Sequence, residues 1–172
     1  MRRNHMVWIF PVGLLLAFFL DGSVSQIFSQ QLLQYPYNLI SHLVVLWLVL
    51  ATLFEDNRNL HLVVWAAIIG GIFDLYYTSI FGVYVFIFPL VVFTTRALNN
   101  YLQPNFLSGL LIYFIDITLV ESLGYVAANA VHLTSTSGTD FLVFTLGPTL
   151  ALNLALYVIL YFPIRWLFYK YD

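Results

Sequence analysis

Three acidic residues of this sequence lie within long apolar stretches, where a charged group needs a chemical reason. Asp74 follows the run AAIIGGIF, and Asp116 and Glu121 lie in LLIYFIDITLVESLGYV. A carboxylate at the centre of a bilayer helix costs about 2.5–3.5 kcal/mol on insertion scales. Such residues handle protons or ions, or make hydrogen bonds between helices. The residues around each acid distinguish these roles.

Small residues lead directly to Asp74. Gly70 and Asp74 are four residues apart, and Gly71 lies alongside, so a helix would present a nearly side-chain-free stripe that ends at the carboxylate. A neighbouring helix could approach closely along it. The turn that follows is short, so the amides of Thr78, Ser79 or the next residues could donate to Asp74. We predict that Asp74 pins a helix hairpin, with proton or ion handling as the alternative.

Asp116 and Glu121 are five residues apart, which places them on different faces of a helix. They are therefore a poor acid/base pair. Asp116 could reach a hydroxyl or amide on an adjacent span, or stay protonated, since burial disfavours the charged form. No basic residue is expected at comparable depth, so the sequence predicts no ion pair buried within the chain.

No catalytic, cofactor or metal site is predicted. The sequence has no Cys, and it lacks a nucleophile elbow, a P-loop and a dinucleotide-binding fingerprint. The six basic residues are scattered, which gives no support for binding nucleic acid. The histidines have no i, i+4 pair and are interpreted as interfacial or capping residues: His5, His42, His61 and His132.

The elements that position the acids must be membrane helices. The 172 residues are 62% hydrophobic and only 8% charged, so polar surface could not cover a soluble domain. The apolar runs lack the alternation of barrel strands, which predicts an all-α fold, a polytopic bundle of six transmembrane helices in a single domain over residues 1–172. The predicted spans are about 7–22, with a continuation of this first span to residue 28 left open, 39–54, 60–77, 83–98, 106–130 and 141–162.

The basic residues predict the orientation. With a cytoplasmic start, all six fall on one side of the membrane, so both termini are expected in the cytoplasm. The first 25 residues also resemble a signal peptide. Asp21 beside the apolar core argues against cleavage, and so does the odd five-span topology that cleavage would leave. The basic residues are Arg2, Arg3, Arg58, Arg96, Arg165 and Lys170.

Between the third and fourth spans, Gly70 and Gly71 lead to Asp74 and Leu75, and a short turn with Ser79 leads to Gly82. This pattern resembles the MreD family of rod shape-determining membrane proteins. In that family a Gly-rich third span ends in an Asp, usually followed by Leu, and a small-residue turn leads to a Gly that opens the next span. YPYNL at 35–39 is similar to the Pro-Asp-Leu entrance of the second span, with Asn38 near the usual acid. The family is distantly similar to the S-components of energy-coupling-factor vitamin transporters, which share a six-helix fold. The matching residues are Gly70, Asp74, Leu75, Ser79 and Gly82, with Pro36 and Leu39.

The resemblance implies a non-enzymatic scaffold of the cell-wall elongation machinery in the bacterial plasma membrane. Its partners would be an MreC-type single-span protein, other elongation-complex proteins and the lipid bilayer, and homodimer formation stays open. The alternative is a vitamin-type transporter subunit that holds its ligand near the outer face through Asp74, Glu121 or Asp140. An intramembrane enzyme ranks last. The candidate structural or partner-contact residues are Gly70, Gly71, Asp74, Gly82, Asp116 and Glu121.

Overall fold

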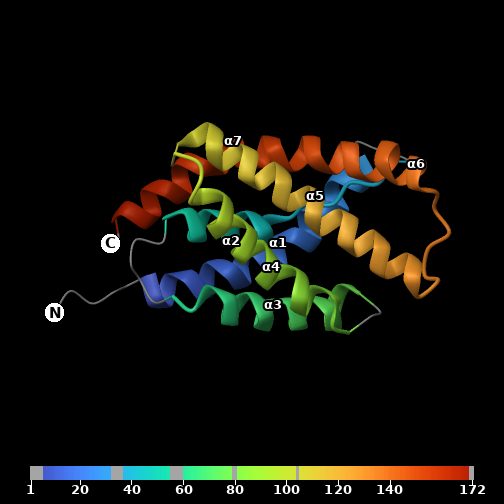
Figure 1. Cartoon of the computed structure of the whole chain (residues 1–172), viewed down its shortest axis with the longest axis horizontal. Coiled ribbons are helices and arrows are strands. Elements are labelled where there is room, and N and C mark those ends of the chain that lie inside the picture. The colour runs from blue at the N-terminus through green and yellow to red at the C-terminus, as the bar shows by residue number, and fades with distance from the viewer. Residues whose placement is uncertain (1–5, 32–36, 55–59, 79–80, 104, 171–172) are drawn as a thin grey trace.

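The structure is a computed structural model that describes residues 6–31, 37–54, 60–78, 81–103 and 105–170. These residues are mostly helical and include no strand, which confirms the all-α prediction (Figure 1). Several residues used above lie outside the described ranges: Arg2, Arg3, His5, Pro36, Arg58 and Ser79. The helices are α1 (Met6–Gln31), α2 (Leu43–Phe54), α3 (Leu62–Tyr77), α4 (Val83–Asn99), α5 (Phe106–Ala130), α6 (Gly138–Asp140), the π-helix η1 (Phe141–Leu146) and α7 (Gly147–Lys170).

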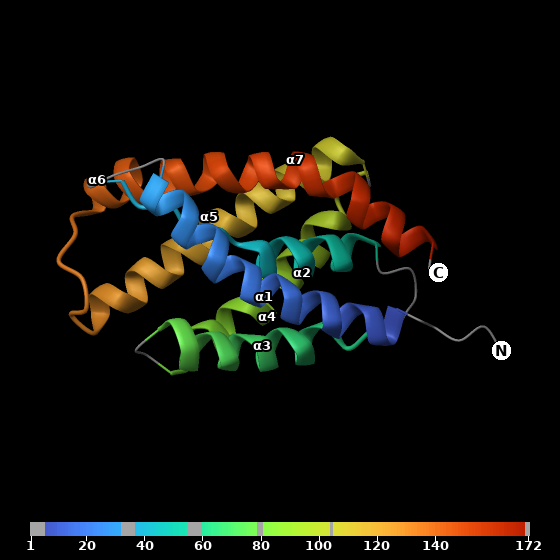
Figure 2. The same cartoon turned by 180° about the vertical axis from the view of Figure 1, so that it is seen from behind.

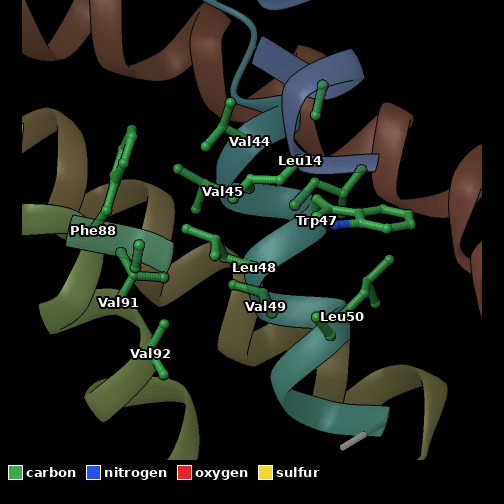
Figure 3. Packing of buried hydrophobic residues seen from close by; sticks show 14 of the residues in the cluster. Leu14, Val44, Val45, Trp47, Leu48, Val49, Leu50, Phe88, Val91 and Val92 are labelled. Carbon is green, nitrogen blue, oxygen red and sulfur yellow. The ribbon is translucent and has the colours of Figure 1, made fainter. Parts of the chain in front are cut away.

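The last three helices form one continuous rod (Figures 1 and 2), so the described residues make up six helical units. The start of α1 and the end of α7 lie at the same end of the bundle, and α3 and α4 form an antiparallel hairpin. α2 lies inside, packed against α1, α4, α5 and α7. Ten of its twelve residues are buried, as expected of a helix that is apolar on all sides (Figure 3).

Helix length separates the six units into two groups. Among the described residues, three helices are long and apolar enough to cross a membrane: Met6–Val24, Phe106–Ala130 and Gly138–Lys170. α2, α3 and α4 are apolar but shorter. The 12 residues of α2 rise only about 18 Å. This is less than the thickness of a bilayer core, about 30 Å.

Residues 37–42 form an extended chain, so the second predicted span is not helical at its start. Helix was expected from about residue 39, but the helix begins at Leu43, and Leu39, Ser41 and His42 are buried in extended conformation. The ends of two other units also differ from the prediction. α1 continues past residue 22 to Gln31, a little beyond the continuation to residue 28 that was left open, and α7 runs through Pro163 to Lys170 rather than ending near residue 162.

Pro148 accounts for the contact between η1 and the extended chain. A proline has no N–H, so the carbonyl four residues earlier, that of Phe144, loses its usual helical donor. The amide of Asn38 donates to this carbonyl at 2.7 Å instead. The π-helical turn therefore holds the beginning of the extended chain against the α6–η1–α7 rod.

Candidate helix-packing and polar-contact site

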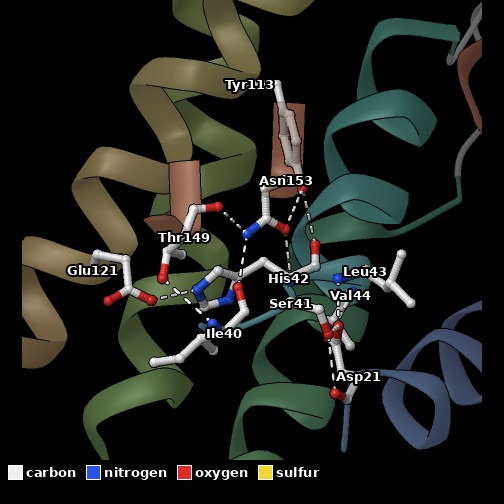
Figure 4. Close-up of polar contacts among 10 residues, drawn as sticks. All are labelled: Asp21, Ile40, Ser41, His42, Leu43, Val44, Tyr113, Glu121, Thr149 and Asn153. Carbon is white, nitrogen blue, oxygen red and sulfur yellow. Dashed lines mark hydrogen bonds and ion pairs between the residues drawn. The ribbon is translucent and has the colours of Figure 1, made fainter. Parts of the chain in front are cut away.

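Asp21 of α1 caps the buried start of α2. Its carboxylate accepts hydrogen bonds from the amides of Leu43 at 2.5 Å and Val44 at 2.9 Å, and from the hydroxyl of Ser41 at 2.9 Å (Figure 4). The first amides of a helix have no partner inside the helix, and in an apolar interior each unsatisfied group costs several kcal/mol. Asp21, considered above only in relation to cleavage, therefore stabilises the break before α2.

Asn153 of α7 holds the extended chain from the opposite side. Its amide nitrogen donates to the carbonyls of Ile40 and Thr149, both at 2.8 Å, and its oxygen accepts from the amide of His42 at 2.8 Å (Figure 4). The hydroxyl of Tyr113 on α5 donates to the same oxygen at 3.2 Å. The side chain is fully buried and all its hydrogen-bonding capacity is used. One residue of α7 thus joins α5 to the extended chain.

His42 pairs with Glu121, which corrects two expectations. Nε2 of His42 lies 2.5 Å from Oε1 of Glu121 on α5, and both side chains are buried. His42 was interpreted as interfacial or capping, and no buried ion pair was predicted. Both expectations assumed a continuous helix in the second span. The extended chain instead turns the imidazole toward α5, so Glu121 faces a basic partner rather than lipid.

Asp74 closes the α3–α4 hairpin. One of its carboxylate oxygens accepts from the amide of Gly82 at 2.8 Å, and both accept from the amide of Tyr84 at 3.0 and 3.1 Å. The amide of Val85 and the hydroxyl of Thr78 contribute longer bonds of 3.3 Å. Thr78 donates through its hydroxyl rather than its amide, Ser79 lies outside the described residues, and the amide donors are Gly82 of the turn and two residues of the first turn of α4. Asp74 is therefore buried as the acceptor for the start of α4.

The glycines of this hairpin have different surroundings. A Cβ on Gly70 would overlap the backbone of Tyr84, whereas one on Gly71 would meet only the Cγ2 atom of Val85 at 3.5 Å. Gly82 has open space around it but a φ of 107°, which L side chains rarely adopt. Gly70 is thus required for close helix contact and Gly82 for the turn, while Gly71 lies beside the contact.

Asp116 faces α4 and is separate from Glu121, as the five-residue spacing indicated. The hydroxyl of Thr95 donates to its Oδ2 at 2.7 Å, and neither residue is exposed. This is a contact to a hydroxyl of an adjacent helix. The other oxygen, Oδ1, has no partner among the described residues.

Asp140 lies apart from the buried acids, in an exposed cap of α6. Its amide donates to the hydroxyl oxygen of Ser137 at 3.1 Å, and that hydroxyl donates to its carboxylate at 2.7 Å. Within the described ranges no three His, Asp or Glu side chains are grouped so that they could hold a metal ion. The acids therefore occupy separate contacts rather than one shared site.

A family model described as rod shape-determining protein MreD matches residues 2–171. The chain belongs to the MreD family. It is similar to the cell shape-determining protein MreD of Streptococcus pneumoniae (strain ATCC BAA-255 / R6), with 31% identity over 156 residues that cover 89% of this chain and 90% of the relative. It is also similar to the rod shape-determining protein MreD of Bacillus subtilis (strain 168), with 25% identity over 166 residues that cover 94% and 92%. No solved structure matches.

The match confirms the family resemblance drawn from the third and fourth spans. MreD membership and the apolar helices identify a membrane protein, and the relatives support a role in determining rod shape. Both relatives are named for shape rather than for a reaction.

Proposed function

We propose that this MreD protein is a non-enzymatic scaffold of the cell-wall elongation machinery, which binds an MreC-type single-span protein and further peptidoglycan-synthesis components. The observation that carries the proposal is the use of the buried acids. Asp21 and Asp74 accept from backbone amides at the starts of α2 and α4, and Glu121 contacts His42. Carboxylates used in this way fix how helices meet, which suits a protein that presents a rigid helical surface to its partners.

We also propose six crossings with both termini in the cytoplasm. The described basic residues support this orientation, because Arg96, Arg165 and Lys170 lie near the ends of α4 and α7, at the end of the bundle where the chain starts and finishes (Figure 1). The chain contains no Cys, so single cysteines can report topology. Tyr101→Cys should be labelled only from the cytoplasm and Leu133→Cys only from outside. The reverse pattern would refute cytoplasmic termini, and labelling of both from one side would refute a crossing by α5 and with it the six crossings.

The extended chain before α2 provides an argument against the transporter alternative. In transporters, the N-termini of interrupted helices point at anionic groups of the substrate. Here the carboxylate of Asp21 occupies that position at the start of α2, and Asn153 and Glu121 are also committed to the extended chain. This arrangement favours the scaffold. Native mass spectrometry that found a stoichiometric vitamin-like ligand would favour the transporter instead.

Two experiments test the scaffold. Depletion of the protein should turn rods into rounded cells, and the MreC-type protein should co-purify with it from native membranes in mild detergent. Asp74→Ala should reduce co-purification because α4 loses its amide acceptor, whereas Leu75→Ala, a change of an outward-facing side chain, should not. Membrane abundance is measured for both variants. The scaffold is wrong if depletion leaves both cell shape and MreC association unchanged.

A further inference from the structure

A groove lies between α1 and α7, with α2 as its floor. It has a volume of about 500 Å³. One wall is a single face of α1, whose lining residues recur every three to four positions from Trp8 to Leu20. The other wall is formed by Leu160, Ile164 and Leu167 of α7. Leu43, Leu46 and Trp47 of α2 lie at the bottom. The lining is apolar throughout, and the volume falls within the range of about 300–1,000 Å³ that is typical of small-molecule sites.

The floor of the groove is held in place by Trp47. Its indole N–H donates to the carbonyl of Phe10 at 3.1 Å, and its ring packs against Phe10 on one side and Phe168 on the other, with centroid distances of 6.4 and 5.7 Å. Gly13 has no side chain to displace the indole, and a Cβ there would overlap the Trp47 ring. The position of the groove floor is therefore fixed by specific contacts of Trp47 with α1 and α7.

The length of the groove identifies its occupant. The α1 wall covers twelve residue steps, from Trp8 to Leu20, or about 18 Å. This is close to one leaflet, since the whole hydrocarbon core is about 30 Å thick. A spanning partner helix would need a contact along the full depth and close approach over small residues. Here the rims are large side chains, including Trp8, Leu16 and Leu167, and the groove ends where Asp21 and Ser41 begin the buried polar contacts.

The charge at the end of α7, the helix that forms one wall of the groove, indicates the headgroup. Arg165 and Lys170 lie in the last turns of α7, and both are exposed. The guanidinium of Arg165 lies 5.4 Å from the centre of the Tyr169 ring, and the Lys170 ammonium lies 4.3 Å from that of Trp166. Exposed Trp8 and Trp166 are residues that sit at headgroup level. Cations at this level attract anionic lipids of the cytoplasmic leaflet.

We propose that the α1–α7 groove binds one acyl chain of an anionic phospholipid from the cytoplasmic leaflet, with the headgroup near Arg165 and Lys170. The site uses only the orientation given under the proposed function and does not depend on the scaffold role. A lipid at this position would cover the outer faces of α1 and α7 and join the first helix of the bundle to the last.

The test uses the purified full-length chain, native mass spectrometry and two lipids with identical chains, phosphatidylglycerol and phosphatidylcholine. The wild type should retain one phosphatidylglycerol in preference to phosphatidylcholine. Leu16→Trp, which fills the groove, should reduce retention at least tenfold. The control Leu15→Trp changes the same residue type one position away, where the side chain is also exposed but does not line the groove, and should retain the lipid.

Combined Arg165→Gln and Lys170→Gln changes should bring the two lipids to equal retention without abolishing binding. The proposal is overturned if Leu16→Trp and Leu15→Trp retain lipid equally, whether both bind or both fail, or if the wild type does not prefer the anionic lipid. It is also overturned if Leu16→Trp alters self-association or MreC co-purification while lipid retention is unchanged. None of these results would contradict the scaffold proposal, because that proposal is tested by cell shape after depletion.

Discussion

Gly70 and Gly71 provide a paired test of how α3 meets α4. The two residues are adjacent in sequence, and both are replaced by Ala. At position 70 the new methyl group would lie 2.6 Å from the carbonyl carbon of Tyr84 and 2.9 Å from the amide nitrogen of Val85. These are backbone atoms, so no rotamer change can relieve the overlap. At position 71 the methyl would be in ordinary van der Waals contact with Val85.

The magnitude follows from these contacts. Overpacking a well-packed interface costs about 1–3 kcal/mol. At position 70 the helices must move apart, which also strains the bonds from Gly82 and Tyr84 to Asp74 one turn away. Gly71→Ala avoids the overlap, and the preference of up to about 1 kcal/mol for Ala over Gly in a helix applies to both variants and cancels in their difference. The free energies of unfolding of the two variants should therefore differ by about 1–3 kcal/mol, with Gly70→Ala the less stable.

Unfolding by sodium dodecyl sulfate in mixed micelles, followed by far-ultraviolet circular dichroism, measures this difference. Both variants must first show wild-type helix content at zero denaturant. Cell shape in a depleted background gives an independent reading, because Gly70→Ala should fail to restore rods when Gly71→Ala does. Equal midpoints for the two variants would refute the close backbone contact between α3 and α4.

Three further predictions use the same unfolding measurement. Asp21→Ala should destabilise the protein by more than 2 kcal/mol, since it leaves two buried helix-start amides without an acceptor, and Asp21→Asn should be milder because its oxygen can still accept. Thr95→Val should cost about 1–3 kcal/mol, and adding Asp116→Leu should recover part of this loss because no buried carboxylate is left unpaired. A double-mutant cycle of His42→Gln and Glu121→Gln should give a coupling energy of about 0.5–3 kcal/mol, and additivity would contradict their contact.

Local features of the sequence predicted the third, fourth and fifth helices well. Their apolar runs are bounded by polar clusters, and the predicted fifth span, 106–130, is helical throughout. The donors to Asp74 are also local, at most eleven residues along the chain, so a short turn was sufficient to anticipate them. Contacts that close within one hairpin can be inferred from spacing alone.

The extended chain before α2 could not be predicted in this way. NLISHLVV has neither Pro nor Gly and reads as the beginning of an apolar helix. The groups that keep it extended are remote, because Asn153 is 111 residues from His42 and Glu121 is 79 residues away. The nearest sequence signal for this conformation was Asp21, which, like Asp74, is an acid at the end of an apolar run. Its position there could have suggested a second helix cap.

The buried acids Asp21 of α1 and Asp74 of α3 follow from one physical requirement. A helix that begins inside an apolar layer exposes amides that neither water nor lipid can satisfy. α2 begins below an extended chain and α4 begins in a tight turn, and in each case the preceding helix supplies the acceptor, Asp21 or Asp74. Glu121 then holds His42, the residue just before α2. Because the partners are backbone amides at two of these positions, an acceptor oxygen matters there more than a charge. Asn should therefore be tolerated at positions 21 and 74 better than Leu, whereas an acid required for proton transfer would tolerate neither.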